Sequence, residues 1–503
     1  MSQNVYCATD ERMRKSNHPH KKAVHFIGIG GIGVSALARY FLSKGNIISG
    51  SDTSPSELTD QLKKEGIKIF IGHKPVNIAK GVDLIIHSAA IKKDNPEIKK
   101  AEQLGIPFKS YAEALGELAQ QYKTIAIAGA HGKSTTTAMA SLVFIKAGLD
   151  PTVIIGTKLK EFTPPAGGNN FRSGKSKLLI IEADEYTGAF LNYSPFGAII
   201  TNIDLEHLDY YKNLAEIKKS FLKFIGNIQY GGILILNKDN KNLFSLRNKI
   251  KKIGQKNNLK LYWHSVTLDQ RSQAQCNKLR KILKVSGEHN VSNALGVYTL
   301  AKALNINDKK IFDALSEYRG AWRRMEYRGE LRIMNNKLRI TNENSIIHNS
   351  SFIIPVYDDY AHHPTEIKAT LAGIRQKWPK SAIICVFQPH QEKRLKSLFK
   401  EFAGAFDDAD TLILLDIFKV KGREETKQSV NSQKLAEAIK KRKSLVNVLY
   451  LKSANWRTKN LSKTLKQIII QNQHKSVLNQ HKSALVIMMG AGDIYKMTDK
   501  LIK

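Results

Sequence analysis

Short apolar runs that end in glycine-rich or polar turns recur along the whole chain. Three of them, AVHFIG, TIAIAG and VIMMGAG, begin at Ala23, Thr124 and Val486. Stretches of helical pattern separate such runs, and strands that alternate with helices indicate parallel sheets covered by helices. In open sheets of this kind, ligands bind beyond the carboxyl ends of the strands. The pattern therefore predicts an α/β fold with functional residues in the turns that follow the strands.

The chain has 503 residues, which is too long for one ordinary hydrophobic core. The alternation of strands and helices restarts near Thr124 and again after Arg324, so we expect three α/β segments. Residues 1–20 are expected to form a disordered tail. The polar stretch Lys251–Asn277 is expected to be a surface excursion.

The formal net charge of +35 raises the question of a polyanionic partner. The lysines are spread along the chain, without a basic stretch interleaved with aromatic residues, so we expect no nucleic-acid binding. We attribute the charge mainly to a general preference for lysine. No apolar run is long enough to span a bilayer, so no membrane insertion is expected, and the start of the chain does not resemble a secretion signal. The three cysteines are far apart, which fits a cytoplasmic protein without a disulfide framework.

The strongest local motif is GAHGKSTTT, which follows the strand TIAIA directly and spans Gly129–Thr137. Glycines allow consecutive backbone N–H groups to turn toward phosphate oxygens, and the helix that follows offers its positive N-terminus. In such a P-loop, Lys133 reaches the β- and γ-phosphates, and the hydroxyl of Ser134 or Thr135 binds Mg²⁺. The alternative is a tight strand–helix turn without a ligand, a context in which a GKS/T sequence is hard to explain.

A second glycine motif, GIGGIG, spans Gly28–Gly33 between a strand and a helix expected from about Ile32 to Lys44. Asp52 closes the next predicted strand, where an acid takes a ribose hydroxyl in dinucleotide-binding folds. The motif predicts a nucleotide diphosphate without saying which one. Close packing of a strand against a helix is the alternative.

Carboxylates and a histidine follow two further predicted strands, KLLII and GAIITN. Side chains at neighbouring strand ends can converge on one edge of a sheet, and oxygen-rich ligation suits Mg²⁺. We therefore expect a magnesium site beside the P-loop. The candidates are Glu182, Asp184 and Glu185 after the first strand and Glu206, His207 and Asp209 after the second.

Two more clusters lie later in the chain. DDYAHHPTE, Asp358–Glu366, places two carboxylates and two histidines at the end of a predicted strand. Two adjacent histidines beside acids favour the orientation of a nucleotide or a role in proton transfer. WRRME, Trp322–Glu326, places two arginines before the last segment, where they suit bidentate phosphate binding, with a solvated hinge as the alternative.

Taken in order, these motifs resemble those of the Mur ligases of peptidoglycan synthesis, and within that family the alanine-adding branch. The resemblance runs from about Lys22 to the C-terminus and also includes GEHNVSNA, FQPH and GAGDI. It implies an N-terminal Rossmann-like domain for a UDP-sugar, a central P-loop ATPase-type domain with a mixed sheet, and a C-terminal Rossmann-like domain that closes over the site. The expected boundaries are 1–20 for the tail and 21–118, 119–322 and 323–503 for the domains.

The resemblance also implies roles for individual residues. Those expected to be catalytic are Lys133, Glu182, His207 and Arg324, and those expected to bind Mg²⁺ are Ser134, Glu182 and His207. The residues expected to contact ATP are Gly129, Ala130, His131, Gly132, Lys133, Ser134, Thr135, His289, Asn290, Asn293, Arg324 and Asp359. Those expected to contact the UDP-linked substrate are Gly28, Gly30, Gly31, Ile32, Gly33, Asp52, His390 and Arg394, and those expected on the amino-acid side are Tyr360, His362 and His363.

The reaction that the resemblance implies is ATP-dependent ligation of L-alanine to the carboxylate of UDP-N-acetylmuramate through an acyl phosphate, giving ADP and phosphate. Glu206 and Gln391 depart from the family pattern, which has an aspartate and an arginine there. EADEYTGAF is also similar to the family's murein-peptide recycling ligase, which stays an alternative. Two further alternatives are a NAD-dependent oxidoreductase, based on GIGGIG and Asp52, and a nucleotide-sensing module without activity. The added amino acid and the oligomeric state are left open by the sequence.

Overall fold

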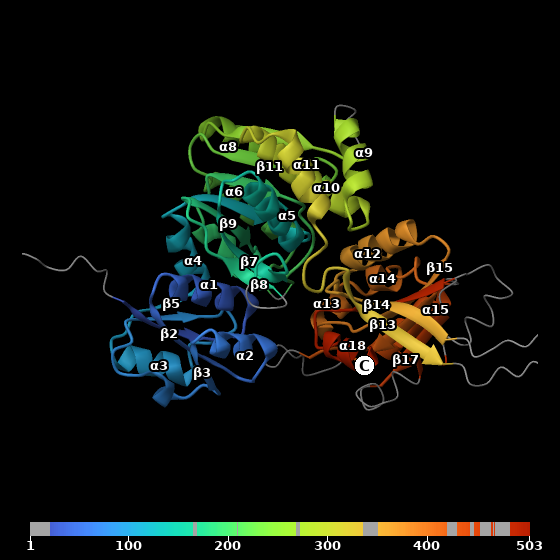
Figure 1. Cartoon of the computed structure of the whole chain (residues 1–503), viewed down its shortest axis with the longest axis horizontal. Coiled ribbons are helices and arrows are strands. Elements are labelled where there is room, and N and C mark those ends of the chain that lie inside the picture. Colours follow the sequence, from blue (N-terminus) through green and yellow to red (C-terminus); the bar gives the residue numbers. More distant parts are fainter. Residues whose placement is uncertain are drawn as a thin grey trace, which may run out of the picture. The chain divides into compact units, whose positions relative to one another are not determined.

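The computed structural model describes residues 21–163, 168–208, 210–267, 272–334, 351–419, 430–442, 447–452, 464, 465, 467 and 483–502. The expected tail, 1–20, lies outside these residues. The chain divides between Tyr111 and Ala112 into two compact units, and each is built from strands and helices (Figure 1). Among the described residues, no helix combines the length and the apolar composition needed to cross a bilayer.

The first unit is a parallel five-stranded sheet in the order β3-β2-β1-β4-β5. The apolar strand β1 lies at its centre, where Val24, Phe26 and Ile27 are buried. The elements are β1 (Ala23–Ile27), α1 (Ile32–Ser43), β2 (Ile47–Asp52), α2 (Glu57–Lys64), β3 (Lys68–Ile71), η2 (Pro75–Asn77), β4 (Leu84–His87), α3 (Pro96–Gln103) and β5 (Phe108–Ser110), followed by α4 (Tyr111–Ala119).

The central sheet has seven strands in the order β12-β11-β10-β6-β9-β7-β8, and only the β7–β8 pair is antiparallel. It is therefore the mixed sheet that was predicted, with the P-loop strand β6 between β10 and β9. Helix α5 packs against α10 and α11. The elements are β6 (Lys123–Ala128), α5 (Lys133–Lys146), β7 (Thr152–Leu159), β8 (Asn169–Arg172), β9 (Leu178–Ala183), η3 (Tyr186–Asn192), β10 (Gly197–Ile200), α6 (Leu214–Gly226), β11 (Ile233–Asn237), α7 (Lys241–Phe244), α8 (Arg247–Lys256), β12 (Lys260–His264), α9 (Gln273–Ile282), α10 (Glu288–Ala303) and α11 (Asp308–Glu317).

The C-terminal sheet has six strands in the order β13-β14-β18-β15-β16-β17, with β13 antiparallel at one edge. Strand β15 is buried on both faces, because alternate residues such as Ile384 and Cys385 belong to different apolar clusters. The elements are β13 (Glu326–Met334), β14 (Ser351–Asp359), α12 (Pro364–Lys377), β15 (Ser381–Phe387), α13 (Glu392–Ser397), α14 (Phe399–Ala403), β16 (Thr411–Leu415), α15 (Ser432–Lys441), β17 (Asn447–Leu451), β18 (Ser483–Met489) and α18 (Tyr495–Leu501).

The three sheets confirm the predicted α/β fold class with three domains. The boundaries at 118 and 322 stay predictions. One expectation needs correction: the polar stretch Lys251–Asn277 contains the end of α8, the whole of β12 and the start of α9. Its apolar residues are few, and Val266 and Cys276 among them are buried.

Candidate nucleotide and metal site

The P-loop turns sharply between β6 and α5, and its geometry requires glycine at two positions. Gly129 has a φ of +138°, and a Cβ atom there would lie 2.0 Å from Oγ1 of Thr201. Gly132 has a φ of +82°, and a Cβ atom there would lie 2.8 Å from Oδ1 of Asn293. At both positions, the backbone conformation and the neighbouring side chains exclude any residue that has a Cβ atom.

The end of β10 holds the P-loop in this shape. The backbone N–H of His131 donates to Oδ1 of Asn202 at 2.9 Å, and Nδ2 of Asn202 donates back to the His131 carbonyl at 2.9 Å. The Thr201 hydroxyl donates to the same carbonyl at 2.6 Å. The side chains that follow β10 therefore fix the backbone that is expected to surround phosphates.

Lys133, the first residue of α5, lies among acceptors. Its Nζ donates to the Gly129 carbonyl at 2.7 Å and to Oε2 of Glu185 at 2.9 Å, and Oδ1 of Asp184 is 3.7 Å away. Burial by itself lowers the pKa of Lys133, but the Glu185 and Asp184 carboxylates outweigh burial, and the pKa lies above its usual value. The ammonium is therefore charged at neutral pH.

Two of the predicted Mg²⁺ ligands lie side by side. The Ser134 hydroxyl donates to Oε2 of Glu182 at 3.0 Å, and the Gly156 N–H donates to Oε1 of Glu182 at 2.7 Å. Burial raises the pKa of Glu182, and the Gly156 hydrogen bond and the Lys133 charge oppose this rise. A cation beside Ser134 would oppose the effect of burial and favour the charged carboxylate.

The third predicted Mg²⁺ ligand, His207, pairs with Glu185. Its Nε2 is 3.3 Å from Oε1 of Glu185 and 3.9 Å from Oδ1 of Asp184, and ligand atoms of these three residues lie within 4.8 Å of one another. Burial disfavours the Glu185 carboxylate, but Lys133 and His207 outweigh it and lower the pKa of Glu185 to about 2. Asp209, the last of the sequence candidates, lies outside the described residues.

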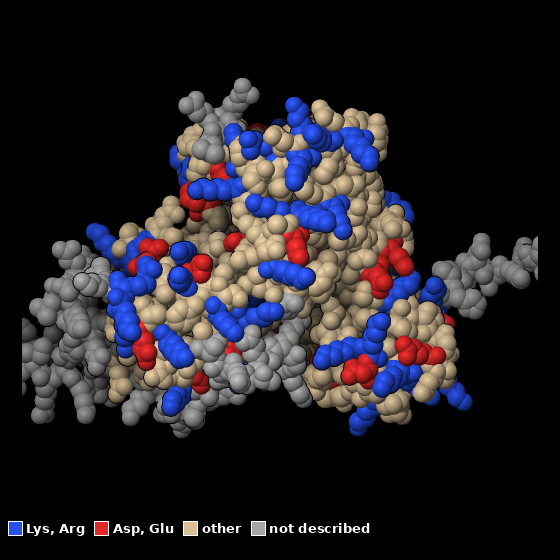
Figure 2. Space-filling model, turned by 180° about the vertical axis from the view of Figure 1, so that it is seen from behind, with Lys and Arg blue, Asp and Glu red and all other residues tan. Residues whose placement is uncertain are grey.

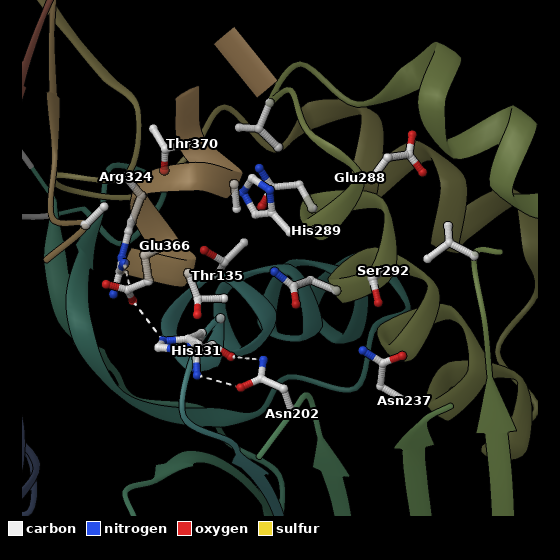
Figure 3. Close-up of a pocket in the computed structure, with 18 of the residues that line it drawn as sticks. His131, Thr135, Asn202, Asn237, Glu288, His289, Ser292, Arg324, Glu366 and Thr370 are labelled. Carbon is white, nitrogen blue, oxygen red and sulfur yellow. Dashed lines mark hydrogen bonds and ion pairs between the residues drawn. The ribbon is translucent and has the colours of Figure 1, made fainter. Parts of the chain in front are cut away.

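A cavity of about 390 Å³ opens between the central and C-terminal domains (Figure 3). Its walls include eight of the residues expected to contact ATP, and Figure 3 shows His131, Thr135 and Arg324 facing into one space. The eight are His131, Gly132, Thr135, His289, Asn290, Asn293, Arg324 and Asp359.

The C-terminal domain contributes a carboxylate and a guanidinium to this cavity. Asp359, at the end of β14, accepts from the backbone N–H groups of Met325 and Ala361 at 2.8 Å each. Arg324 lies 3.8 Å from Oε1 of Glu366, and its guanidinium is 5.1 Å from the centre of the Tyr360 ring. Burial opposes the charge of Arg324, but Glu366 and Asp359 keep the pKa of Arg324 above its usual value.

His131 of the P-loop joins the two domains. Its Nε2 lies 3.0 Å from Oδ2 of Asp204, and its Nδ1 lies 3.3 Å from Oε1 of Glu366 in α12. Burial disfavours the imidazolium, but these two carboxylates outweigh burial and raise the pKa of His131 to about 10. His131 is therefore a cation at neutral pH.

His131, Glu206 and His363 also lie close enough together to share an ion. However, Nδ1 of His363 accepts from the backbone N–H of Thr365, and Oε1 of Glu206 accepts twice from Arg394, at 3.0 and 2.7 Å. Because protein partners already engage these groups, we interpret the cluster as an ion-pair network and not as a metal site.

The residues expected on the substrate side lie next to this network. The His362 Nδ1 is 3.2 Å from Oε2 of Glu366, and burial lowers the pKa of His362 to about 4. The His390 ring is stacked on Phe418 and lies 5.9 Å from the His362 ring. Glu206, which departs from the family pattern, thus contacts Arg394, which is expected to contact the UDP-linked substrate. The substrate roles of Tyr360, His362, His363, His390 and Arg394 stay predictions.

The first unit has its own glycine turn. The N–H of Gly30 donates to Oδ2 of Asp52 at 2.8 Å, and the N–H of Thr53 donates to Oδ1 of Asp52 at 2.8 Å. The N–H of Gly28 donates to the Ser51 carbonyl at 2.8 Å, and α1 begins at Ile32. Asp52 thus holds the glycine turn, and its predicted contact with the UDP-linked substrate stays a prediction.

Several cavity residues were not among the predicted site residues. Asn202 and Asp239 follow β10 and β11, where the rule that ligands bind at strand ends pointed without selecting a residue. Glu366 lies within the DDYAHHPTE motif, and only the structure shows its contact with His131. Asn237, Asn240 and Thr267 also lie at or after the ends of β11 and β12, and Ser292 lies within GEHNVSNA, whereas Tyr318 carries no sequence signal.

Family models match the chain in the order of its three domains. The Mur ligase family, catalytic domain, matches residues 23–123. The Mur ligase middle domain matches residues 127–301, and the Mur ligase, glutamate ligase domain, matches residues 346–492.

Full-length relatives agree with these matches. A UDP-N-acetylmuramate–L-alanine ligase of Acetivibrio thermocellus is 38% identical, covering 96% of this chain and 97% of the relative. One of Clostridium kluyveri is 40% identical over 84% of this chain and 88% of the relative. The crystal structure of UDP-N-acetylmuramate-alanine ligase from Thermotoga maritima has a TM-score of 0.69 and 25% identity, covering 96% of this chain and 98% of that structure. The chain belongs to the Mur ligase family.

Proposed function

We propose that this chain is an ATP-dependent amide-bond ligase that couples L-alanine to the carboxylate of UDP-N-acetylmuramate in peptidoglycan precursor synthesis. The cavity supports this proposal most directly, because P-loop residues such as His131 and Thr135 face Arg324 and Asp359 of the C-terminal domain across it. Relatives with this activity in their names align over nearly the whole chain. A MurF ligase of the same fold, at a TM-score of 0.51, was solved in complex with ADP.

The residues present fit ATP and Mg²⁺. Gly129 and Gly132 permit the tight turn that a phosphate-binding loop requires, and Lys133 and Arg324 supply cations. The Ser134 hydroxyl and the Glu182 carboxylate, 3.0 Å apart, offer oxygen ligands for Mg²⁺, and His207, which follows β10, pairs with Glu185, which follows β9. When bound, Mg²⁺ neutralises phosphate charge during transfer.

The chemistry follows from the poor reactivity of a carboxylate at neutral pH. Transfer of the γ-phosphoryl group to the carboxylate gives an acyl phosphate and ADP, and the amine then attacks the carbonyl and releases phosphate. The task of the protein is to position the groups and to neutralise negative charge. Lys133 of the P-loop and Arg324 of the cavity wall are suited to this task because their partners keep both charged.

The UDP-linked substrate is assigned to the first unit, at Gly28, Gly30, Gly31, Ile32 and Gly33 with Asp52. The backbone N–H groups that open α1 suit a diphosphate. We place the reaction in the cytoplasm, where ATP and nucleotide-linked sugars are available.

The deciding experiment measures phosphate release with ATP, UDP-N-acetylmuramate and each amino acid in turn. We expect release with L-alanine above that with the other amino acids. Release only with a murein tripeptide as acceptor would favour the recycling ligase, and no release with any acceptor would contradict ligase activity. Oxidation of NADH in the presence of carbonyl compounds would instead support the oxidoreductase alternative.

A further inference from the structure

The two adjacent arginines of WRRME have different surroundings. The side chain of Arg324 lines the cavity and is 27% exposed, whereas Arg323 is 4% exposed. Nη2 of Arg323 donates to the carbonyl of Gly490 and, at 3.1 Å, to that of Gly492, both in the loop after β18. Arg323 is therefore neither a solvated hinge residue nor a cavity residue.

Aromatic rings surround the Arg323 guanidinium. Its Cζ lies 4.5 Å from the centre of the Tyr495 ring, 4.8 Å from that of Tyr360 and 5.7 Å from that of Trp322. Cations are attracted to aromatic faces at such distances, and the attraction is stronger away from water. The guanidinium is thus held by two carbonyls and three rings.

The backbone around Arg324 is in an unfavourable conformation. Arg323 has a φ of +56° and Met325 a φ of +51°, in the left-handed region that side chains disfavour. Such a turn persists only if its surroundings stabilise it. The Tyr360 N–H donates to the Arg323 carbonyl at 2.7 Å, and the Met325 N–H donates to Oδ2 of Asp359 at 2.8 Å.

The same loop that accepts from Arg323 also holds Asp359. The N–H of Gly490 donates to the Asp359 carbonyl at 3.0 Å, while the Gly490 carbonyl accepts from Arg323. The turn that carries Arg324, the end of β14 and the loop after β18 are therefore fastened together through Arg323.

We propose that Arg323 is a positioning residue, whose guanidinium fixes the turn that presents Arg324 to the nucleotide. The inference rests on the proposed function, because Arg324 is assigned there to the phosphates of ATP. Arg323 touches no reacting group and acts through its neighbour. Lysine cannot replace it, since one ammonium does not reproduce a planar fork between two carbonyls and three rings.

A double-mutant cycle tests this dependence. We expect R323M to lower kcat/KM for ATP by about 10- to 100-fold, because a small misplacement of a catalytic group has effects of that size. In an R324M background, the same R323M change should lower kcat/KM by less than about threefold, because the group that it positions is already gone. A purely structural role would reduce the folded fraction by the same factor in both backgrounds.

Arg375 provides a matched control. It also donates to backbone carbonyls of the C-terminal domain, those of Ser381 at 2.8 Å and Asp408 at 3.1 Å, and is not a cavity residue. R375M should lower the unfolding temperature without changing kcat/KM per folded molecule. If R323M folds poorly, R323K enters the same cycle, and folded protein is measured by circular dichroism in every case.

The outcomes separate the two proposals. No ligase activity in the wild-type chain would contradict the proposed function. If the wild type is active, two results would overturn the role of Arg323. One is a kcat/KM for ATP in both R323M and R323K that stays within about threefold of wild type. The other is a double variant in which the losses of the two single variants multiply.

Discussion

At the residue scale, the surroundings of Lys133 keep its ammonium charged and close to the predicted phosphate site. Its ammonium has the Gly129 carbonyl and the Glu185 and Asp184 carboxylates as partners, all in contact distance. We expect Lys133→Ala to lower kcat by a factor on the order of 100 to 1000, about 3–4 kcal/mol of barrier, while the fold stays intact. Steady-state phosphate release and circular dichroism measure the two effects.

The control for this change is Lys146→Ala at the other end of the same helix. Lys146 pairs with Glu317 at 2.8 Å, and both side chains are well exposed. Loss of this surface pair should leave kcat unchanged. Retention of more than about a tenth of wild-type activity in Lys133→Ala would reject the assigned role.

His131 predicts a specific dependence of stability on pH. Its pKa in the folded chain is about 10, against about 6.5 in an unfolded chain. A raised pKa stabilises the folded state fully below the unfolded value, and this stabilisation is lost as the pH rises to about 10. The urea midpoint of wild type should therefore exceed that of H131Q most at pH 6, less at pH 8, and little at pH 10. A difference that stays constant over this range would show that the His131 charge does not stabilise the fold.

Local motifs made many of the site residues predictable, because P-loop chemistry depends on residues that are adjacent in sequence. GAHGKSTTT alone indicated Lys133, and it narrowed the predicted Mg²⁺ hydroxyl to Ser134 or Thr135. The ion pair between His131 and Glu366 joins residues that are far apart in the chain, so no local pattern specifies it. The strand-end rule predicted that Glu185 and His207 converge, but not that they form an ion pair with each other.

At the scale of elements, the turn from β6 to α5 makes a sharp prediction. A Cβ atom at Gly129 would lie 2.0 Å from Oγ1 of Thr201, so Gly129→Ala must displace the loop or the end of β10. We expect ATP affinity to fall more than tenfold, about 1.4 kcal/mol or more, in a nucleotide titration.

Gly148→Ala is the control, because it introduces the unfavourable backbone conformation without the clash that Gly129→Ala introduces. Gly148 also has a positive φ, +83°, but a Cβ atom there would meet nothing within 4 Å. Gly148→Ala should cost about 1–2 kcal/mol of stability and leave ATP affinity unchanged. Equal effects of the two changes on ATP affinity would mean that the Thr201 contact is not what matters.

Elements with strong apolar patterns were the predictable ones. The helix expected from about Ile32 to Lys44 is observed as Ile32–Ser43. Helix α8 and strand β12 were not foreseen, since α8 buries only Ile250 and Gly254 among many charged and polar residues. Their formation depends on packing against β11 and α6, which periodicity within the segment does not reveal.

For the whole molecule, the preference for lysine explains why Lys and Arg (blue) outnumber Asp and Glu (red) on the face shown in Figure 2. Function depends instead on how the central and C-terminal domains meet around the cavity. At their contact, the start of α10 touches α12 through two glycines: a Cβ atom at Gly373 would lie 3.1 Å from the Gly287 Cα and 3.2 Å from its N. Helix α10 carries His289 and Asn293, and α12 carries Glu366, all of which line the cavity.

Gly373→Ala should therefore act as a wedge between two walls of the ATP cavity. Overpacking by one methyl group costs about 1 kcal/mol or more, so we expect the KM for ATP to rise about fivefold, and further in Gly373→Val. Gly226→Ala is the matched control, because that glycine also lies in a helix and a Cβ atom there meets nothing within 4 Å. It should add about 0.5–1 kcal/mol of stability without changing the KM for ATP. A KM that stays within twofold of wild type in both Gly373 variants would mean that the cavity tolerates separation of α10 from α12, and that closeness of the two domains is not needed for ATP binding.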